Sequence, residues 1–170
     1  MKGRNYRQAK SMPYARSEYI PGSPPSKIMK FVVGDTQGTY DYKLATLALR
    51  YAQIRHNALE AARIAANKVL IDSIGETGYL LKVKTYPHVV LRENKMIATA
   101  GADRLQEGMR KAFGKPIGRA ARVQVGDPII EIYVKEAHLD AAKQALRVSA
   151  AKLPTPTRVS VEKLETAEAA

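Results

Sequence analysis

A basic stretch with two glycines, GMRKAFGKP at residues 108–116, comes nearest to a known chemical motif, the phosphate-binding P-loop. A P-loop places four residues between its glycines and a Ser or Thr after its Lys, where the hydroxyl ligates magnesium. Here five residues separate Gly108 from Gly114, and Pro116 stands where the hydroxyl residue should be. Gly118 disfavours the helix that a P-loop opens. The stretch is therefore rejected as a nucleotide site.

Other residue types that carry chemistry are absent or scattered. The chain has no cysteine, which excludes disulfides, thiol catalysis and cysteine-based zinc sites. Its histidines, at positions 56, 88 and 138, lack the spacing of a shared metal site. No Ser, His and acidic residue form a recognisable nucleophile motif. We therefore expect no enzyme activity, no catalytic residue, no metal, no cofactor and no small-molecule substrate.

Positive charge is the unusual feature of the composition. Twenty-eight Lys and Arg against 16 Asp and Glu give a net charge of +12 over 170 residues. The excess is confined to residues 1–30, with net +6, and residues 82–122, with net +7. Because solubility alone needs no such segregation, the pattern predicts a polyanion-binding surface made of two segments. An ordinary solvated surface is the alternative.

Residues 1–30 are predicted to form an extended basic arm. Four prolines oppose a helix, and Tyr6, Tyr14 and Tyr19 alternate with basic residues. Against RNA, Arg and Lys can neutralise phosphates while Tyr rings stack on exposed bases. A flexible tail or linker is the alternative.

Residues 31–161 are predicted to form one α+β domain, with two main helices packed on a largely antiparallel sheet. Helices are expected at residues 57–73, with a cap formed by Asn57 and Glu60, and at residues 136–153. Residues 43–54 fit a strand or a helix, and a strand is favoured. The other expected strands are residues 28–33, 79–86, 88–91, 119–125, 130–134 and 157–161. Residues 162–170 are expected to fray.

Alternation on two of these strands places basic side chains on the side away from the core. Lys82 and Lys84 point outward on one strand, and Arg122 points outward on the other. An outward row of this kind suits contact with phosphates, although ordinary solvated surface is the alternative. The expected inward positions are Leu81, Val83, Ala121, Val123 and Val125.

Residues 98–116 are predicted to form a long basic loop inserted in the domain. Gly108 weakens any helix there by about 1 kcal/mol relative to Ala, and loops of this length are uncommon without a function. The alternative is a short helix that packs Leu105, Met109 and Phe113, spaced four residues apart, on the core.

Several stretches resemble one ribosomal family. NALEAARIAANK at residues 57–68 and AGADRLQEGMRKAFGKP at residues 100–116 are similar to the archaeal and eukaryotic large-subunit proteins called L-ten-e, whose bacterial counterpart is L-sixteen. Asn94-Lys95-Met96, Tyr6-Arg7 and Met12-Pro13-Tyr14 fit as well, so that the resemblance covers residues 4–161. It implies an α/β-hammerhead fold lodged in large-subunit ribosomal RNA beside the tRNA corridor. The cysteine-free arm and the Ala/Glu-rich tail favour an archaeal type.

The resemblance implies a structural constituent of the large subunit in the cytoplasmic ribosome. Its partners would be ribosomal RNA, tRNA and neighbouring ribosomal proteins, and its loop would help to shape the A-site and peptidyl-transferase region for tRNA. The residues expected to bind ribosomal RNA are Arg4, Arg7, Lys10, Arg16, Lys82, Lys84, Arg92, Lys95, Arg119 and Arg122. Those expected near tRNA are Arg104, Arg110, Lys111 and Lys115, with Arg92 bracing the base of the loop.

Three rival functions are weighed against this one. A free-standing RNA-binding or chaperone module would sediment away from large subunits. An RNA-modifying enzyme would need a cofactor pocket or an acid/base pair, and the sequence offers neither. A membrane protein is the least favoured, because no apolar run approaches about 18 residues and neither helix has a strongly basic polar face.

Overall fold

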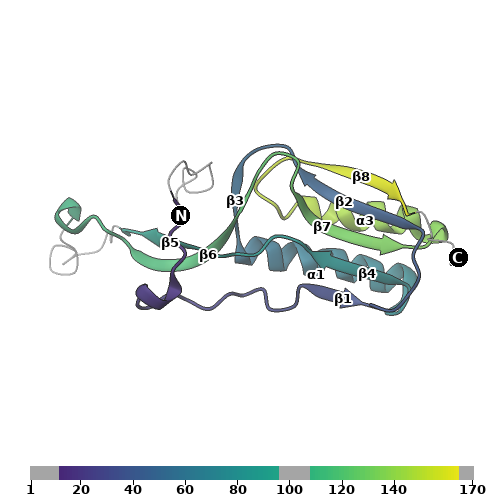
Figure 1. Ribbon diagram of the computed structural model, residues 1–170, viewed down its shortest axis with the longest axis horizontal. Coiled ribbons are helices and arrows are strands. Elements are labelled where there is room, and N and C mark those ends of the chain that lie inside the picture. The colour runs from purple at the N-terminus through teal and green to yellow at the C-terminus, as the bar shows by residue number, and fades with distance from the viewer. Residues whose placement is uncertain (1–11, 96–107, 165–170) are drawn as a thin grey trace, which may run out of the picture.

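The computed structural model describes residues 12–95 and 108–164, which contain two antiparallel sheets and two main helices (Figure 1). The predicted α+β class is therefore confirmed. The strands are β1 (Val32–Gly34), β2 (Tyr42–Ala48), β3 (Ala52–Arg55), β4 (Tyr79–Val83), β5 (Val89–Glu93), β6 (Lys115–Val123), β7 (Pro128–Val134) and β8 (Thr157–Lys163). The helices are α1 (His56–Ile74) and α3 (Leu139–Ala150), with 3-10 turns η2 (Ser17–Tyr19), η3 (Gly108–Lys111) and η4 (Glu136–His138).

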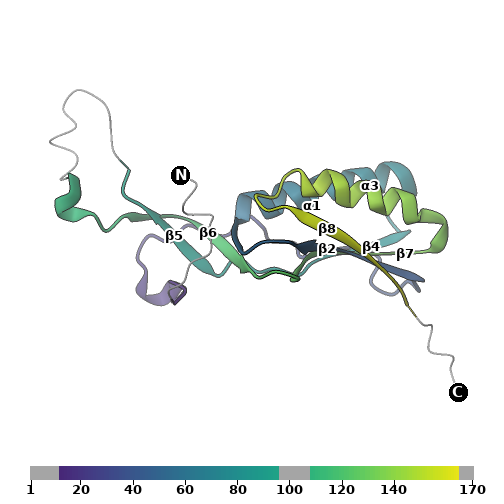
Figure 2. The same cartoon turned by 90° about the horizontal axis from the view of Figure 1, so that it is seen from above.

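The larger sheet has the strand order β1-β4-β7-β2-β8, and the smaller has the order β3-β6-β5. Figure 2 shows α1 and α3 side by side on one face of the larger sheet, with β5 and β6 projecting away from it. Alanines on the inner faces of both helices are fully buried, which lets the helices approach each other and the sheet closely. The centre of this core is formed by Leu44, Leu59, Ala62, Ala66, Leu81, Ile130, Ile132, Ala142, Ala145 and Leu146.

One bent antiparallel ribbon joins the two sheets. β2 pairs with β7 in the larger sheet, and their direct continuations, β3 and β6, pair with each other in the smaller sheet. At the bend, the Ala48 N–H donates to the Asp127 carbonyl at 3.0 Å, and the Gly126 N–H donates to the Ala48 carbonyl at 2.8 Å. The same backbone pairing therefore positions both sheets.

The bend corrects the prediction of one strand over residues 43–54. This region is indeed extended rather than helical, but it forms two strands in different sheets. Residues 49–51 leave the ladder, and the Leu49 N–H donates instead to the Pro156 carbonyl at 3.0 Å. Val125, predicted to point inward, lies in the turn after β6 and is 54% exposed.

Other strand boundaries also differ from the prediction. β8 runs two residues past the predicted end, because Glu162 and Lys163 pair with β2. β6 begins at Lys115, so that the end of the predicted loop is strand. β1 and β4 are shorter than predicted: β1 pairs with β4 only over residues 32–34, and β4 ends at Val83, the last residue that pairs with β7.

The predicted cap of the first helix is wrong. β3 leads directly into α1, which begins at His56, so that Asn57 is already helical and no side chain caps the helix. Glu60 instead accepts two hydrogen bonds from the Arg63 guanidinium, at 2.9 and 2.6 Å. The predicted end at Gly75 is confirmed, and its φ is +89°. The second helix is shorter than predicted, because η4 replaces its first turn and residues 151–153 form a turn in which the Lys152 and Leu153 N–H groups donate to carbonyls three residues back.

Residues 12–30 lie against the rest of the protein. The Val90 N–H donates to the Tyr14 carbonyl at 2.8 Å, and the Arg119 Nε donates to the Pro24 carbonyl at 3.1 Å. The Lys27 N–H donates to His56 Nδ1 at 3.1 Å, and Ile28 is buried in the main core. The first 11 residues of the predicted arm lie outside the described residues.

The His56 ring is buried where residues 12–30 meet α1. Burial lowers its pKa, and the nearby charges of Arg55, Lys27 and Arg119 lower it further. A neutral ring suits the structure, because Nδ1 must remain an acceptor for the Lys27 N–H. The ring therefore links the N-terminal segment to the helix only in its neutral form.

Replacing Gly34 should destabilise the fold more than replacing Gly75. Both glycines have a positive φ, +98° and +89°, which costs an L-residue about 1–3 kcal/mol. A Cβ at Gly34 would also collide with the Tyr79 carbonyl, whereas a Cβ at Gly75 meets nothing within 4 Å. In urea unfolding, Gly34→Ala should therefore lose more unfolding free energy than Gly75→Ala. Equal losses would show that the contact with Tyr79 relaxes freely.

Stability should fall on acidification below about pH 6.5, the ordinary pKa of His56. Because its pKa is lowered in the folded state, the unfolded ring gains a proton that the folded ring resists, and unfolding becomes easier. His56→Gln should flatten the dependence of the free energy of unfolding on pH between 7 and about 5. His88→Gln, at an exposed histidine, is the control and should keep the wild-type slope. A wild-type slope in His56→Gln would contradict this explanation.

Candidate nucleic-acid interface

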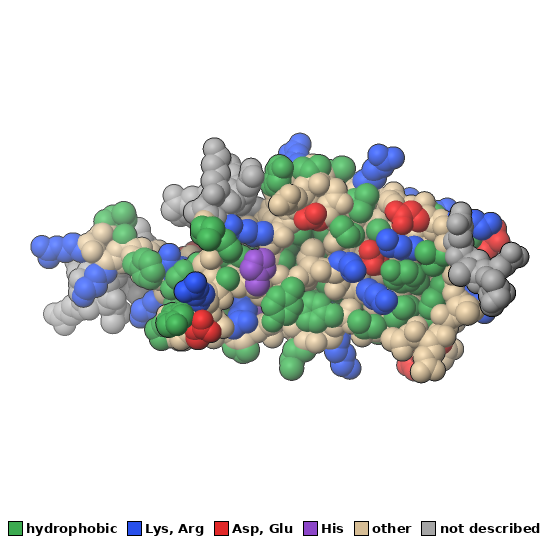
Figure 3. Space-filling model, in the orientation of Figure 1, with side chains coloured by type: hydrophobic (Ala, Val, Ile, Leu, Met, Phe, Trp, Pro, Cys, Tyr) green, Lys and Arg blue, Asp and Glu red, His purple; other side chains and the backbone are tan. Residues whose placement is uncertain are grey.

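The larger sheet has a face that no helix covers among the described residues, here called the open sheet face (Figures 1 and 2). Basic side chains gather on it around a few acids (Figure 3). Strand registers place Lys82 of β4 beside Glu131 of β7, and Lys43 of β2 between Tyr133 of β7 and Glu162 of β8.

Five residues form a connected group at its centre, the Glu131 cluster: Lys43, Lys82, Lys84, Glu131 and Tyr133. Glu131 Oε1 lies 3.5 Å from Lys43 Nζ, and Oε2 lies 3.9 Å from Lys84 Nζ. The Tyr133 hydroxyl donates to Oε2 at 3.1 Å, and Lys82 Nζ lies 5.1 Å from the centre of the Tyr133 ring. One buried carboxylate thus restrains three ammonium groups. It forms ion pairs with Lys43 and Lys84, and it accepts the hydrogen bond of Tyr133, whose ring lies next to Lys82.

Two pKa shifts fit this arrangement. Burial lowers the pKa of Lys43, but Glu131 and Glu162 outweigh that effect and leave it above its ordinary value. Burial raises the pKa of Tyr133, and the neighbouring Glu131 carboxylate raises it further. At neutral pH, Lys43 is therefore charged and the Tyr133 hydroxyl keeps the proton that it donates.

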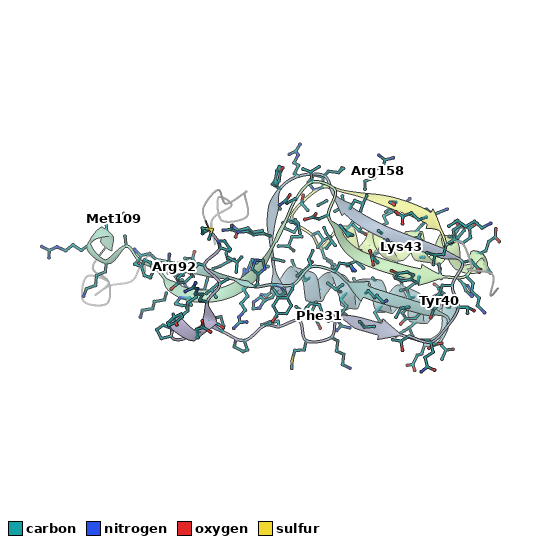
Figure 4. The ribbon with its side chains drawn as sticks, in the orientation of Figure 1. Phe31, Tyr40, Lys43, Arg92, Met109 and Arg158 are labelled. Carbon is teal, nitrogen blue, oxygen red and sulfur yellow. The ribbon has the colours of Figure 1, made fainter. Side chains whose placement is uncertain are left out.

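Aromatic side chains lie at the edges of the same face. Phe31 and Tyr86 have ring centres 5.5 Å apart, and Tyr86 is 57% exposed. Tyr40 lies 6.4 Å from the Tyr133 ring. Figure 4 labels Phe31, Tyr40, Lys43 and Arg158 on this side of the molecule. Lysines interleaved with aromatic rings, of which that of Tyr86 is exposed, are a composition that suits RNA, where phosphates meet ammonium groups and bases stack.

A second basic group surrounds His56 at the junction of the two sheets. Arg55, Lys27 and Arg119 all act on the ring electrostatically. The Arg119 Nε also donates a hydrogen bond to the Pro24 carbonyl. This group therefore combines positive charge with the docking of the N-terminal segment.

Arg92 on β5 connects three segments of the chain (Figure 4). Its guanidinium carbon lies 3.4 Å from the centre of the Phe113 ring and 4.3 Å from that of Tyr14. The two rings meet edge to face, 6.4 Å apart. The cation thus links the N-terminal segment to the residues that precede β6.

Residues 108–114, in the described part of the predicted loop, lie beyond the end of the β5–β6 pair (Figure 1). Met109 is 83% exposed and Phe113 is 72% exposed, so the alternative of a short helix packing these two residues on the core is wrong. They are too far along the projecting strands to reach that core. Arg110, Lys111 and Lys115 are exposed.

The predicted site residues do not form one continuous patch. Lys82 and Lys84 lie on the open sheet face, whereas Arg119 and Arg122, three residues apart on β6, point to opposite faces of the smaller sheet. Arg16 and Lys95 are exposed, next to η2 and after β5. The predicted residues that lie outside the described part of the chain are Arg4, Arg7, Lys10 and Arg104.

Sequence reasoning missed Lys43, Glu131 and Arg158. The signal for Glu131 was present, since one acid interrupts the apolar run PIIEIYV at residues 128–134. Lys43 and Arg158 could be found only from the strand pairing, which places both on the open sheet face.

Other kinds of site find no support within the described ranges. In residues 12–95 and 108–164, no group of His, Asp and Glu could hold a metal ion. No helix there has the length and apolar character needed to cross a membrane.

Comparison with known proteins gives a consistent result. The sequence model of the family described as ribosomal protein L16p/L10e matches residues 9–160. The large ribosomal subunit protein uL16 of Hyperthermus butylicus is 59% identical over 149 residues, covering 88% of this chain and 83% of the relative. The proteins of the same name from Staphylothermus marinus and Sulfolobus acidocaldarius are 54% and 51% identical, covering 95% and 99% of this chain and 93% and 97% of their own lengths. These relatives are archaeal, and the chain belongs to the ribosomal protein L16p/L10e family.

Proposed function

We propose that this protein is a structural constituent of the large ribosomal subunit, which binds ribosomal RNA and helps to shape the tRNA site in the cytoplasmic ribosome. Members of its family are structural ribosomal components, and the chain is not an enzyme. The observation that carries the RNA-binding part is the row of lysines on the open sheet face. Basic side chains gathered on one uncovered face are the electrostatic footprint expected of a surface that binds nucleic acid.

The open sheet face would act on RNA phosphates. Lys84 is exposed, and Lys82 has no acidic partner among the ion pairs of the described residues. Both ammonium groups can therefore neutralise phosphates and release counterions. Tyr86 beside them offers a ring for a base or ribose.

The N-terminal segment and the smaller sheet would contact further RNA. We assign residues 1–30 as an RNA-binding arm and residues 31–161 as the globular domain that carries it. The docking of Tyr14, Pro24 and Lys27 supports a fixed direction for the arm. Its basic residues would then contact RNA helices other than those on the open sheet face. Further contacts with these helices would come from Arg92, Lys95, Arg119 and Arg122.

The projecting β5–β6 pair would carry residues 98–116 toward tRNA and the peptidyl-transferase region. The residues proposed to lie near tRNA are Arg104 and the exposed Arg110, Lys111 and Lys115. Arg92 would brace this projection through its contacts with Phe113 and Tyr14. The chemistry of peptide transfer would belong to the RNA.

Removing charge from the open sheet face should weaken RNA binding in a salt-dependent way. For Lys82→Gln with Lys84→Gln, the slope of log affinity against log salt should fall by about 2, one for each lost phosphate contact. Filter binding to large-subunit ribosomal RNA of the source organism measures this slope. Lys68→Gln with Lys152→Gln removes the same charge from exposed residues of α1 and the segment after α3, and should change the slope less. Equal effects would point to net charge alone.

Neutralising Arg110, Lys111 and Lys115 together should reduce tRNA accommodation more than subunit assembly. Assembly is measured by recovery of the variant in large subunits on sucrose gradients, and accommodation by A-site tRNA binding to those ribosomes. A triple Gln variant at Lys68, Lys143 and Lys152 controls for net charge and should leave accommodation unchanged. If assembly and accommodation fell equally, the loop would have no separate role.

A further inference from the structure

We infer that Glu131 is a positioning residue for RNA binding: an acid that improves the affinity of the protein for a polyanion by holding its lysines in place. This inference rests on the proposed RNA contact of the open sheet face. Figure 4 shows Lys43, one of the lysines that Glu131 holds, on this face.

The location of Glu131 is unusual for an acid. It lies on β7, the central strand of the five-stranded sheet, and is only 4% exposed. Carboxylates are almost never buried unless they are paired, and burying one without a role would be costly. Both of its oxygens are used, Oε1 by Lys43 and Oε2 by Lys84 and the Tyr133 hydroxyl.

These contacts restrain lysines that would otherwise be mobile. A lysine has four rotatable side-chain bonds, and ordering it on a ligand costs conformational entropy. Glu131 orders Lys43 and Lys84 directly, and it fixes the Tyr133 ring beneath Lys82. Part of that entropy is therefore already lost before RNA arrives, which favours binding.

The negative charge of Glu131 should repel RNA only weakly. Two ammonium groups lie within 4.0 Å of its oxygens, and the carboxylate is covered by the side chains of the cluster. A phosphate approaching from outside would meet Lys82 and Lys84 first. We therefore expect replacement of Glu131 to lower RNA affinity through lost positioning more than it raises affinity through lost repulsion. A net fall in affinity shows that positioning dominates, and a net rise shows that repulsion dominates.

Glu162 provides the matched comparison. It carries the same charge and also pairs with Lys43, at 3.3 Å, but its side chain is 58% exposed on the edge strand β8. It has no ion pair with Lys84 and no hydrogen bond with Tyr133 among the described residues. Removing Glu162 therefore removes the same charge and one contact to Lys43, while every contact of Glu131 remains.

The test compares Glu131→Gln, Glu162→Gln and Tyr133→Phe with wild type in binding to large-subunit ribosomal RNA across a salt series. Glu131→Gln should lower affinity about fivefold, the effect of ordering one long side chain on binding, and should leave the salt slope unchanged, because the same lysines still contact the same phosphates. Glu162→Gln should bind RNA as well as wild type or better. Tyr133→Phe changes no charge and should lower RNA affinity, as Glu131→Gln does.

The outcomes separate the inference from the function on which it rests. If both Gln variants bound more tightly by the same factor, Glu131 would be only a charge and the inference would be overturned. Thermal unfolding shows whether each variant is folded. If Glu131→Gln did not fold, Tyr133→Phe would provide the test, and an RNA affinity equal to that of wild type would overturn the inference. If Lys82→Gln with Lys84→Gln bound RNA like wild type, the RNA contact of this face would itself be wrong.

Discussion

The backbone pairing around Ala48 is the constraint on which the rest of the structure depends. Its N–H and carbonyl bond to Asp127 and Gly126 at the point where the ribbon passes from one sheet to the other. Gly126 has φ +91°, a conformation that costs glycine little and other residues considerably more. With this bend fixed, the larger sheet can carry helices on one side and charge on the other, while β5 and β6 extend the molecule away from the core (Figure 2).

The open sheet face shows how a sheet without a covering layer can keep part of its apolar surface away from water. Leu80 and Ala45 lie on this face and are nonetheless buried, because the long stems of neighbouring Lys and Tyr side chains cover them. The charged ends remain at the surface. The layer that covers the apolar side chains is thus the same layer that offers ammonium groups to RNA.

The sequence allowed the fold class, the course of α1 and the inward positions Leu81, Ala121 and Val123 to be predicted, because periodicity reports directly on burial. It did not allow the bend to be predicted, since an extended run looks the same whether its two halves join one sheet or two. For the candidate site, charge segregation pointed to Lys82 and Lys84. The Glu131 cluster was missed because its members come from three strands whose pairing is set by tertiary structure.

The position of β2 has a consequence for how the chain folds. This strand lies inside the larger sheet, yet both of its neighbours, β7 and β8, come much later in the sequence, with Tyr42 opposite Val134 and Lys163. Loop closure over such separations makes folding slow, and the sheet cannot be completed until the last strand has been synthesised. A chain truncated before Thr157 would present β2 as a bare edge able to pair with other chains. Pairing with β8 therefore covers an edge of β2 at which chains could otherwise associate.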